Sequence, residues 1–415
     1  MIEPLLARFA FEPTVVAAAR RAEPQLAGRS QRAVRDEVAA RVLAAFARAG
    51  IAESDLHGTL GYGYDDPARA HYEAILAELF CAERAFVRLS LVSGTHALVT
   101  ALDALLAPGM RLLCASGPPY DTLRRAICGE RGLVSRGIVY QELALAGDGT
   151  VDERELERAS RGAGVVFVQR SRGYAQRPSL SAALCGRVAA LVHRVAPAAA
   201  VVVDDCYCEL VEAEEPTALG ADLAIGSLLK NLGGGLAPGG AYVAGRAALV
   251  ERVAERHYAP GLGAGIGPNL GWGRTLLQGL FLAPLVVGEA LAGLDFAAAL
   301  FAELGFAVDP LPGAERCDVV QAIGLGSPER VLAFARGLQR ALPVNNRFAP
   351  EAGAVPGYGD PVVMSSGAFV AGATIELSCD APLRAPYEVY LQGGIERRQV
   401  ALGALCAADA LVRQT

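Results

Sequence analysis

Six short apolar runs between residues 84 and 245 constrain the fold of this 415-residue chain more than any other feature. They are RAFVRLSLV (84–92), RLLCAS (111–116), GVVFVQRS (164–171), AAVVVDD (199–205), LAIGSL (223–228) and GAYVAG (240–245). Each run has the length of a strand, and the stretches between them include segments with helical spacing. Strands that are buried on both faces have this composition, so the pattern predicts an α/β fold with a mainly parallel sheet covered by helices.

The segments on either side of these runs differ from them in pattern. The N-terminal part is helical in spacing, with SQRAVRDEVAARVLAAFARAG ending at Gly50. From about residue 291, GFAVDPLP, DVVQAIGLGSPERVLAFARGLQRAL and AGATIELSC indicate an alternation of strands and helix. We therefore predict an N-terminal helical segment (1–55), a large domain (56–290) and a smaller C-terminal α/β domain (291–415), with a long helix able to bridge the boundary near 290.

The charge and hydropathy of the chain indicate which binding partners are unsuited to it. The formal net charge is −6 and no basic run occurs, which argues against nucleic acid and anionic membranes. The start, MIEPLLARFAFEP, lacks the basic residues and apolar run of a secretory signal. The most apolar stretch, GLFLAPLVVGEALAGLDFAAALFAELGFAV, is interrupted by Glu289, Asp295 and Glu303 and is expected to be a buried helix leading into a strand.

Nine cysteines are spread through apolar segments without a CxxC pair. Reduced thiols in the cytoplasm are the expected state, and we predict a cytoplasmic protein. DDCYCE has no second pair of ligands downstream, so no metal site is expected.

Lysine usage marks one position for chemistry. Of the 38 Lys and Arg residues, 37 are arginine and one, Lys230, is lysine. A drift of the encoding DNA toward GC-rich codons explains the arginines but not the lysine that remains. Chemistry that needs an amine able to lose its proton cannot use a guanidinium, so Lys230 is a candidate nucleophile. A chance survivor or a plain phosphate contact is the alternative.

Polar residues follow several of the predicted strands, at the edge of the sheet where ligands bind. Ser93, Gly94 and Thr95 open a helix after the first run, so they either bind a phosphate or form an ordinary helix cap. Tyr120 follows two prolines and either stacks on a flat cofactor or covers the core.

Carboxylates end the fourth run. Asp204 and Asp205 close a strand that is expected to be buried, where a carboxylate is costly unless it is paired. Ser227 lies three residues before Lys230, and the glycine-rich segment GGGLAPGG follows Lys230. A lysine for a Schiff base, an aspartate for a ring nitrogen, an aromatic ring and a phosphate site at a helix N-terminus are together what pyridoxal 5'-phosphate requires.

The chain resembles the fold-type I pyridoxal-phosphate enzymes of the cystathionine and methionine γ-lyase superfamily, and within it the aluminium-resistance or methionine γ-lyase-like branch. The resemblance covers about Gly61 to Ala401. It is carried by GYGYDD, SGTHAL, PYDTL, QRSRGYAQRPSL, DCYCEL, GSLLKNLGGGLAPGGAYVAG, GLFLAP and GATIELSCDAPLRAPYEVYLQGG. It implies a large cofactor-binding domain with a sheet of seven-stranded type, plus the smaller C-terminal domain.

By this resemblance, Lys230 forms the Schiff base with the cofactor, Asp204 pairs with its ring nitrogen and Tyr120 lies over the ring. The positions that match phosphate contacts are Ser93, Gly94, Thr95 and Ser227, together with Tyr64 from a neighbouring subunit. The resemblance therefore implies a homodimer or homotetramer with shared active sites.

Two departures from the better-known γ-lyases affect this site. Leu229 replaces a threonine that contacts the phosphate, and QRSR stands where those enzymes have an asparagine near a cofactor oxygen. Gln169, Arg170 and Arg172 are the candidates to replace these lost cofactor contacts. Arg170 and Arg172 are also candidates for binding the substrate, with surface ion pairs as the alternative for the two arginines.

The function implied is a carbon–sulfur lyase that performs γ-elimination on a methionine- or cystathionine-like amino acid. Arg384 is the candidate for binding the substrate carboxylate, with an interdomain ion pair as its alternative. The same residues would also serve a γ-lyase that expels halide or another group, a β-lyase or an aminotransferase. A cofactor-binding regulator is the alternative outside the enzymes.

Overall fold

The computed structural model describes residues 1–28 and 32–414, and the chain divides into two compact units. One unit is Glu37–Phe281, and the other combines Met1–Asp36 with Leu282–Thr415. Both divisions fall inside helices, α3 (Arg32–Ala49) and α10 (Gly273–Glu303). The predicted domains (1–55, 56–290 and 291–415) remain a prediction, and they differ from these units chiefly because residues 1–36 group with the C-terminal part of the chain.

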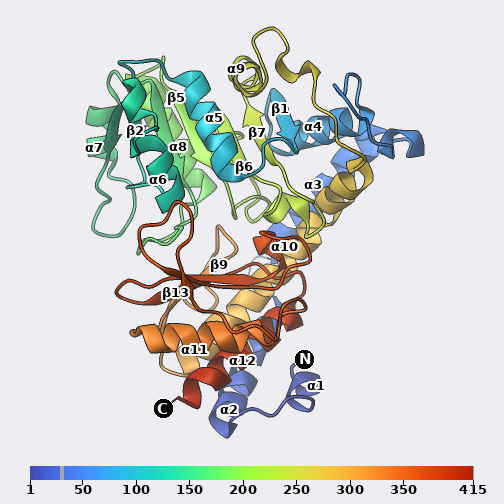
Figure 1. Ribbon diagram of the computed structural model, residues 1–415, viewed down its shortest axis with the longest axis vertical. Coiled ribbons are helices and arrows are strands. Elements are labelled where there is room, and N and C mark those ends of the chain that lie inside the picture. Colours follow the sequence, from blue (N-terminus) through green and yellow to red (C-terminus); the bar gives the residue numbers. More distant parts are fainter. Residues whose placement is uncertain (29–31, 415) are drawn as a thin grey trace. The chain divides into compact units, whose positions relative to one another are not determined.

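The Glu37–Phe281 unit is built on a seven-stranded sheet of order β1-β7-β6-β5-β4-β2-β3 (Figure 1). Its strands are β1 (Arg84–Arg88), β2 (Arg111–Cys114), β3 (Val139–Glu142), β4 (Val165–Gln169), β5 (Ala200–Asp204), β6 (Leu223–Ser227) and β7 (Ala241–Gly245). β7 runs antiparallel to β1 and β6, and the remaining neighbours are parallel. The predicted mainly parallel sheet of seven-stranded type is confirmed, and each of the six apolar runs contains a strand.

Helices cover both faces of this sheet, which is why its strands are apolar without alternation. The helices are α4 (Pro67–Leu79), α5 (Gly94–Leu105), α6 (Asp121–Cys128), α7 (Glu153–Ser160), α8 (Ala182–Val195) and α9 (Ala247–His257). Phe167 and Val202 pack on one face with residues of α5, α6 and α9. Val166 and Val201 pack on the other face with residues of α7 and α8.

The edge strand β3 was not predicted. Its sequence, VYQE, carries two polar residues, and none of its four side chains is fully buried. It pairs only with β2, in parallel register from Arg111 opposite Val139 to Cys114 opposite Glu142. An edge strand needs less apolar sequence than a central one, so the criterion that found the other six strands misses it.

The second unit contains a six-stranded antiparallel sheet of order β10-β11-β12-β13-β9-β8. The strands are β8 (Ala307–Asp309), β9 (Val320–Gly324), β10 (Ala352–Gly353), β11 (Val362–Ser366), β12 (Ser378–Pro382) and β13 (Glu388–Gln392). The helices of this unit include α1 (Glu3–Leu6), α2 (Pro13–Ala22), α11 (Pro328–Gln339) and α12 (Arg397–Val412). A smaller C-terminal α/β part is thereby confirmed.

One expected strand in this unit has another conformation. Most of AGATIELSC lies outside the sheet, because a 3-10 turn occupies Thr374–Glu376 and β12 begins only at Ser378. Leu377 between them has a φ of 85°, which breaks the extended chain. The Glu376 carboxylate accepts hydrogen bonds from the backbone N–H groups of Phe369 and Val370, and these bonds help to hold the turn.

α10 is, among the described residues, the one helix long and apolar enough to cross a membrane by length and composition. Its most apolar 18-residue window has a mean hydropathy of 1.8, but 83% of that window is buried inside the protein. This burial is what a core helix shows, as the sequence predicted, and α10 leads on to β8.

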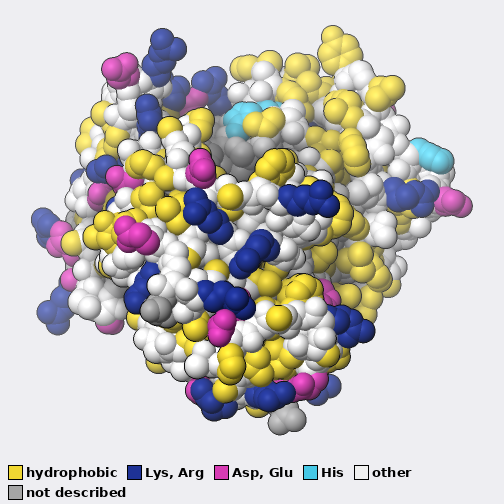
Figure 2. Space-filling model, turned by 60° about the horizontal axis from the view of Figure 1, so that its bottom comes forward, with side chains coloured by type: hydrophobic (Ala, Val, Ile, Leu, Met, Phe, Trp, Pro, Cys, Tyr) yellow, Lys and Arg dark blue, Asp and Glu magenta, His cyan; other side chains and the backbone are white. Residues whose placement is uncertain are grey.

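On the face that Figure 2 shows, basic side chains are interspersed with acidic ones.

Candidate active site

Three neighbouring parallel strands end on polar side chains at the same edge of the large sheet. β4 ends at Gln169, β5 at Asp204 and β6 at Ser227. Gln169 lies opposite Asp204 in the register of β4 and β5, and Asp204 lies opposite Ile225 of β6. Because the carboxyl ends of parallel strands form the binding edge of an open α/β sheet, this edge is the candidate active site.

Lys230 lies in the turn directly after β6. Its backbone N–H donates to the Ser227 carbonyl at 3.1 Å, and its side chain is partly buried. The Lys230 ammonium nitrogen Nζ donates to the phenol oxygen of Tyr207 at 2.9 Å and lies 4.3 Å from the centroid of that ring. The glycine-rich segment that follows packs closely on α10, since a Cβ on Gly234 would lie 2.3 Å from the Gly279 carbonyl oxygen.

Asp204 presents a carboxyl group that is almost fully buried, with 4% of the residue exposed. Its Oδ1 accepts the Cys206 backbone N–H at 3.2 Å. Burial raises the pKa of Asp204 to about 6, against the lowering effect of its hydrogen bonds with Cys206 and of the nearby Lys230 charge. A further positive group beside this carboxyl would stabilise its charged form, so the position suits the partner of a protonated ring nitrogen.

The N-terminus of α5 meets the end of β6. Ser93 caps α5 by accepting the His96 backbone N–H at 3.1 Å. Gly94 lies against the neighbouring segments so closely that a Cβ there would be 3.0 Å from Cys206 Sγ and 3.5 Å from Ser227 Cβ. The start of α5 and Ser227 therefore lie close together. Backbone N–H groups at a helix start and a neighbouring hydroxyl are groups that suit a phosphate.

Tyr120 and Gln169 connect two further loops of the site. Gln169 Oε1 accepts the Tyr120 backbone N–H at 2.8 Å, and Gln169 Nε2 donates to the Ser171 carbonyl at 2.9 Å. The Tyr120 hydroxyl lies 2.8 Å from Thr95 Oγ1, in the first turn of α5. Gln169 thus fixes the loop that carries Tyr120, and Tyr120 connects that loop to the helix that opens at the phosphate site.

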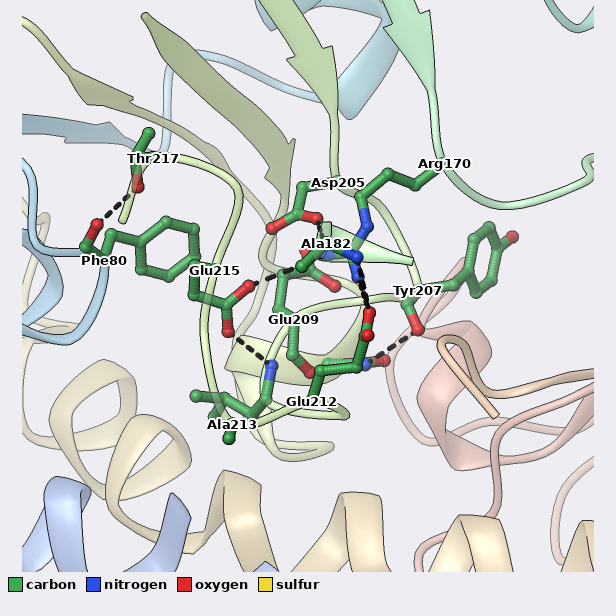
Figure 3. A network of polar contacts seen from close by, with 12 residues as sticks. Phe80, Arg170, Ala182, Asp205, Tyr207, Glu209, Glu212, Ala213, Glu215 and Thr217 are labelled. Carbon is green, nitrogen blue, oxygen red and sulfur yellow. Dashed lines mark hydrogen bonds and ion pairs between the residues drawn. The ribbon is translucent and has the colours of Figure 1, made fainter. Parts of the chain in front are cut away.

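Arg170 has a different use from the predicted substrate contact. It is fully buried, its Nη1 donates to Asp205 Oδ1 at 2.5 Å, and its Nη2 donates to Glu212 (Figure 3). Glu215 lies 3.8 Å from the same guanidinium. Burial raises the pKa of Asp205 and Glu215, and Arg170 opposes this effect. The guanidinium is therefore the cation of a buried carboxylate cluster.

The other predicted site residues lie in separate places. Arg172 is buried in the loop after β4, where its backbone N–H donates to Ser179 Oγ at 3.1 Å. Arg384 belongs to the second unit, and its partly exposed side chain lies 3.3 Å from Asp360. Tyr64 is exposed, and its ring stacks on that of Tyr62 with centroids 5.6 Å apart. The roles of these three residues stay predictions.

Tyr207 has a contact that the sequence did not indicate. DCYCEL drew attention to Asp204, whereas nothing in the spacing marks Tyr207. Its approach to Lys230 depends on a left-handed backbone, with a φ of 72°, which an L-residue with a large side chain rarely adopts. The cysteines of this segment are not disulfide-bonded, and among the described residues no group of three or more His, Cys, Asp or Glu side chains could hold a metal ion.

Comparison with known proteins decides the family. The methionine gamma-lyase family model matches residues 16–412. The chain belongs to the methionine gamma-lyase family. YnbB from Bacillus subtilis (strain 168) is 39% identical over 381 residues, which are 90% of each chain. The crystal structure of a carbon-sulfur lyase involved in aluminum resistance from Clostridium novyi NT is similar, with 34% identity, a TM-score of 0.92 and 98% of each chain covered.

A more distant likeness shows the fold alone. The pyridoxal-5'-phosphate-dependent protein YhfS from Escherichia coli has a TM-score of 0.62 at 17% identity, covering 92% of this chain and 96% of its own. This likeness confirms the predicted fold type I. The family match confirms the predicted cofactor, pyridoxal 5'-phosphate. The protein is a pyridoxal-phosphate-dependent lyase of this family.

The residues at the sheet edge fit this cofactor. A lysine amine, a buried carboxyl with a raised pKa and a helix N-terminus beside a serine supply the three kinds of contact that its aldehyde, ring nitrogen and phosphate need. The absence of a side chain at Gly94 keeps the phosphate side open. Lys230, Asp204, Ser93, Gly94 and Ser227 are thus the residues that would hold it.

Proposed function

We propose that this protein is a carbon–sulfur lyase that performs γ-elimination on a methionine- or cystathionine-like L-amino acid. The observation that carries the proposal is the position of Lys230, the one lysine of the chain, at the same sheet edge as Asp204 and Ser227. Membership of the methionine gamma-lyase family supports the reaction type. The carbon-sulfur lyase from Clostridium novyi supports the scissile bond.

Bound pyridoxal phosphate supplies an electron sink for negative charge that develops at the substrate Cα. With the cofactor bound, Asp204 would keep the ring nitrogen protonated, and the start of α5 with Ser93, Gly94 and Ser227 would bind the phosphate. With the cofactor bound, the amine of Lys230 would remove the proton from the substrate Cα. For γ-elimination the same amine also moves a proton at Cβ, so that the group on Cγ leaves.

Tyr120 is placed to orient the reacting groups. Its ring is the candidate to lie over the cofactor, and its hydroxyl, beside Thr95, is in a position to assist proton transfer. Gln169 holds the Tyr120 backbone and so sets the height of this ring above the sheet edge. In this proposal Thr95 does not contact the substrate, and its hydroxyl positions the Tyr120 hydroxyl.

The substrate carboxylate needs a guanidinium, and we propose Arg384 for it, with Arg172 as the second candidate. Arg384 forms an exposed ion pair with Asp360, which costs little to break when a substrate binds. Arg170 is not proposed, because its guanidinium belongs to the buried cluster. Two variants, Arg384→Gln and Arg172→Gln, distinguish the candidates, since loss of the carboxylate contact raises KM for every amino-acid substrate.

We also propose that the active enzyme is a homodimer or homotetramer in which Tyr64 of one subunit reaches the cofactor phosphate of another. Tyr64 and its neighbour Tyr62 are exposed on a loop, and the same unit also has the exposed apolar residues Leu60, Leu270 and Trp272. Leu270 and Thr59 are joined by a backbone hydrogen bond, so these side chains belong to one paired set of loops. Nine cysteines spread through apolar segments without a CxxC pair favour a cytoplasmic location.

Product analysis tests the reaction. The purified protein is incubated with methionine, cystathionine, cysteine and γ-halogenated amino acids, and 2-keto acid, ammonia, thiol and halide are measured. γ-Elimination of methionine gives 2-oxobutyrate, ammonia and methanethiol, whereas β-elimination of cystathionine gives pyruvate and homocysteine. A Lys230→Ala control must release none of these. Pyruvate as the sole keto acid would make the protein a β-lyase, and exchange of the amino group without release of ammonia would make it an aminotransferase.

A further inference from the structure

The segment that follows β5 brings a second tyrosine to the reactive amine. Lys230 Nζ donates to the Tyr207 hydroxyl at 2.9 Å and also lies 4.3 Å from the centroid of the same ring. One side chain therefore meets the amine with both its oxygen and its aromatic face. Both contacts stabilise an ammonium group, the first as a hydrogen-bond acceptor and the second by cation–π attraction.

The backbone around Tyr207 is held in an unfavourable conformation. Tyr207 has a φ of 72° and Leu210 a φ of 61°, and neither residue is glycine. Left-handed backbone costs a large L-residue on the order of 1 kcal/mol or more, and it persists where the surrounding structure imposes it. The conformation of this segment is therefore set by its contacts rather than by its own preference.

The contacts that impose it come from the lysine's own neighbour and from the buried carboxylates. Asn231, which follows Lys230 in sequence and is fully buried, donates from Nδ2 to the carbonyls of Tyr207 at 3.0 Å and Glu209 at 2.8 Å. The Leu210 backbone N–H donates to Glu215 Oε1 at 2.9 Å. In Figure 3 the Tyr207 carbonyl lies in this network while its ring points away from the carboxylates.

We infer that Tyr207 is a positioning residue for Lys230, which its phenol oxygen and ring hold in place whenever the lysine is not covalently bound. An ammonium group donates to the phenol oxygen, and a neutral amine accepts from the phenol O–H, so the contact holds the amine in both protonation states. The bond from the charged ammonium is the stronger of the two, so the contact favours the protonated amine. Through Lys230, Tyr207 limits the positions from which the amine reaches the substrate Cα. This inference rests on the proposed function for its role in turnover, but not for the contact itself.

The test uses three variants of the full chain. Tyr207→Phe removes the oxygen and keeps the ring, and Tyr207→Leu removes both. Tyr140→Phe is the matched control, because Tyr140 lies on the edge strand β3, where its hydroxyl donates to Glu142 at 2.6 Å. If Tyr207→Leu fails to fold, Tyr207→Phe alone decides the outcome.

The first measurement does not need the cofactor. Cofactor-free protein is treated briefly with an amine-acylating reagent from pH 6 to 11, and the fraction modified is read from the mass of the Lys230 peptide, which is unambiguous because the chain has one lysine. Losing a stabilising contact of the ammonium shifts the midpoint of this pH profile down by about half a unit to one unit in Tyr207→Phe. The shift is larger in Tyr207→Leu, and Tyr140→Phe leaves the midpoint unchanged.

The second measurement is steady-state turnover of the best substrate from the amino-acid panel. A loosely held lysine lowers kcat about tenfold in Tyr207→Phe and leaves KM within about threefold of the parent value. Identical pH profiles in the parent, both Tyr207 variants and the control would overturn the inference. A shifted profile in a protein that turns over no amino acid would instead support the contact and overturn the proposed function.

Discussion

Gly94 at the start of α5 lies against Ser227 at the end of β6, so that a Cβ atom on Gly94 would stand 3.5 Å from the Ser227 Cβ. The same added atom would be 3.0 Å from Cys206 Sγ. These distances leave no room for a branched side chain. A larger residue at position 94 would therefore push Cys206 and Ser227 away from the start of the helix.

Gly94→Val is expected to weaken cofactor binding at least tenfold, because the valine methyl groups fill the proposed phosphate site and displace Ser227. Titration of cofactor-free protein with pyridoxal phosphate, followed by visible absorbance, measures this change. Gly147→Val is the control, since Gly147 lies in a loop with no atom within 4 Å of an added Cβ. Equal affinities of the two variants would show that the phosphate binds elsewhere.

Lys230 carries the covalent link in our proposal, so the purified protein is expected to be yellow. Lys230→Arg removes the visible band of the linked cofactor, because a guanidinium does not lose its proton under these conditions and cannot act as the nucleophile. Borohydride reduction of the parent protein followed by peptide mapping is expected to place the label on Lys230. A label on the N-terminal amine alone would contradict the assignment.

Asp204 and Asp205 are adjacent in sequence but have different partners, and their amide variants are expected to fail in different ways. Asp204→Asn keeps the fold and lowers kcat by about 100-fold or more, because the ring nitrogen loses the charge that keeps it protonated. Asp205→Asn removes the partner of the buried Arg170 and costs about 3 kcal/mol of stability. Turnover and urea unfolding measured on both variants distinguish the two effects, and the reverse pattern would move the catalytic carboxylate to Asp205.

The buried Asp204 carboxyl also predicts how the stability of the cofactor-free protein depends on pH. Its pKa is raised to about 6, above that of an unfolded aspartate, so the folded state binds the proton more tightly. The contribution of Asp204 to folding therefore falls as the pH rises from about 4 to about 6, and it stays low above that range. Asp204→Asn removes this dependence.

Chemical unfolding of the parent and of Asp204→Asn at pH 5 and pH 7.5 checks this prediction. The parent is expected to lose on the order of 1 kcal/mol relative to the variant between these two pH values. Other buried carboxyls titrate in both proteins, so the difference between the proteins isolates Asp204. A difference that is constant with pH would contradict the raised pKa.

Much of this fold could be predicted from sequence because the central strands are buried on both faces. VVV in β5 and VVFV in β4 have no alternation, and in the structure their side chains enter the two cores in turn. Strands that are buried on both faces can be recognised from the composition of a short stretch of sequence. β3 and the turn at Thr374–Glu376 were not found, because an edge strand tolerates polar residues and Leu377 breaks the extended chain in a way that composition does not indicate.

Site residues could be predicted from the sequence where the chemistry of the side chain determines the role of the residue. They could not be predicted where the role depends on which residues the fold brings together. A single lysine and an aspartate at the end of an apolar run are visible in the sequence. The position of Arg170 in the buried cluster depends on Asp205 and Glu212, which only the folded chain brings beside it. Tyr207 depends on a left-handed backbone, which is imposed from outside its own segment.

The shared active site gives the last prediction. Tyr64 lies on an exposed loop of its own chain, which Arg69 anchors by donating to the Gly63 carbonyl at 2.7 Å and to the Gly267 carbonyl at 2.6 Å. The anchored loop holds the ring out from its own unit, as a residue that contacts another subunit must be held. Tyr64→Phe and Lys230→Ala are each expected to be folded and to have little activity.

Mixing the two inactive proteins under conditions that exchange subunits is expected to restore activity. A mixed dimer contains one site in which Lys230 of one chain meets Tyr64 of the other, so random exchange gives about a quarter of the active sites of the parent protein. Exchange is verified by mass spectrometry of differently labelled chains. If exchange is complete and no activity returns, Tyr64 acts within its own chain and the shared site is wrong, whereas a return to about one quarter of parental activity requires that the two residues come from different subunits.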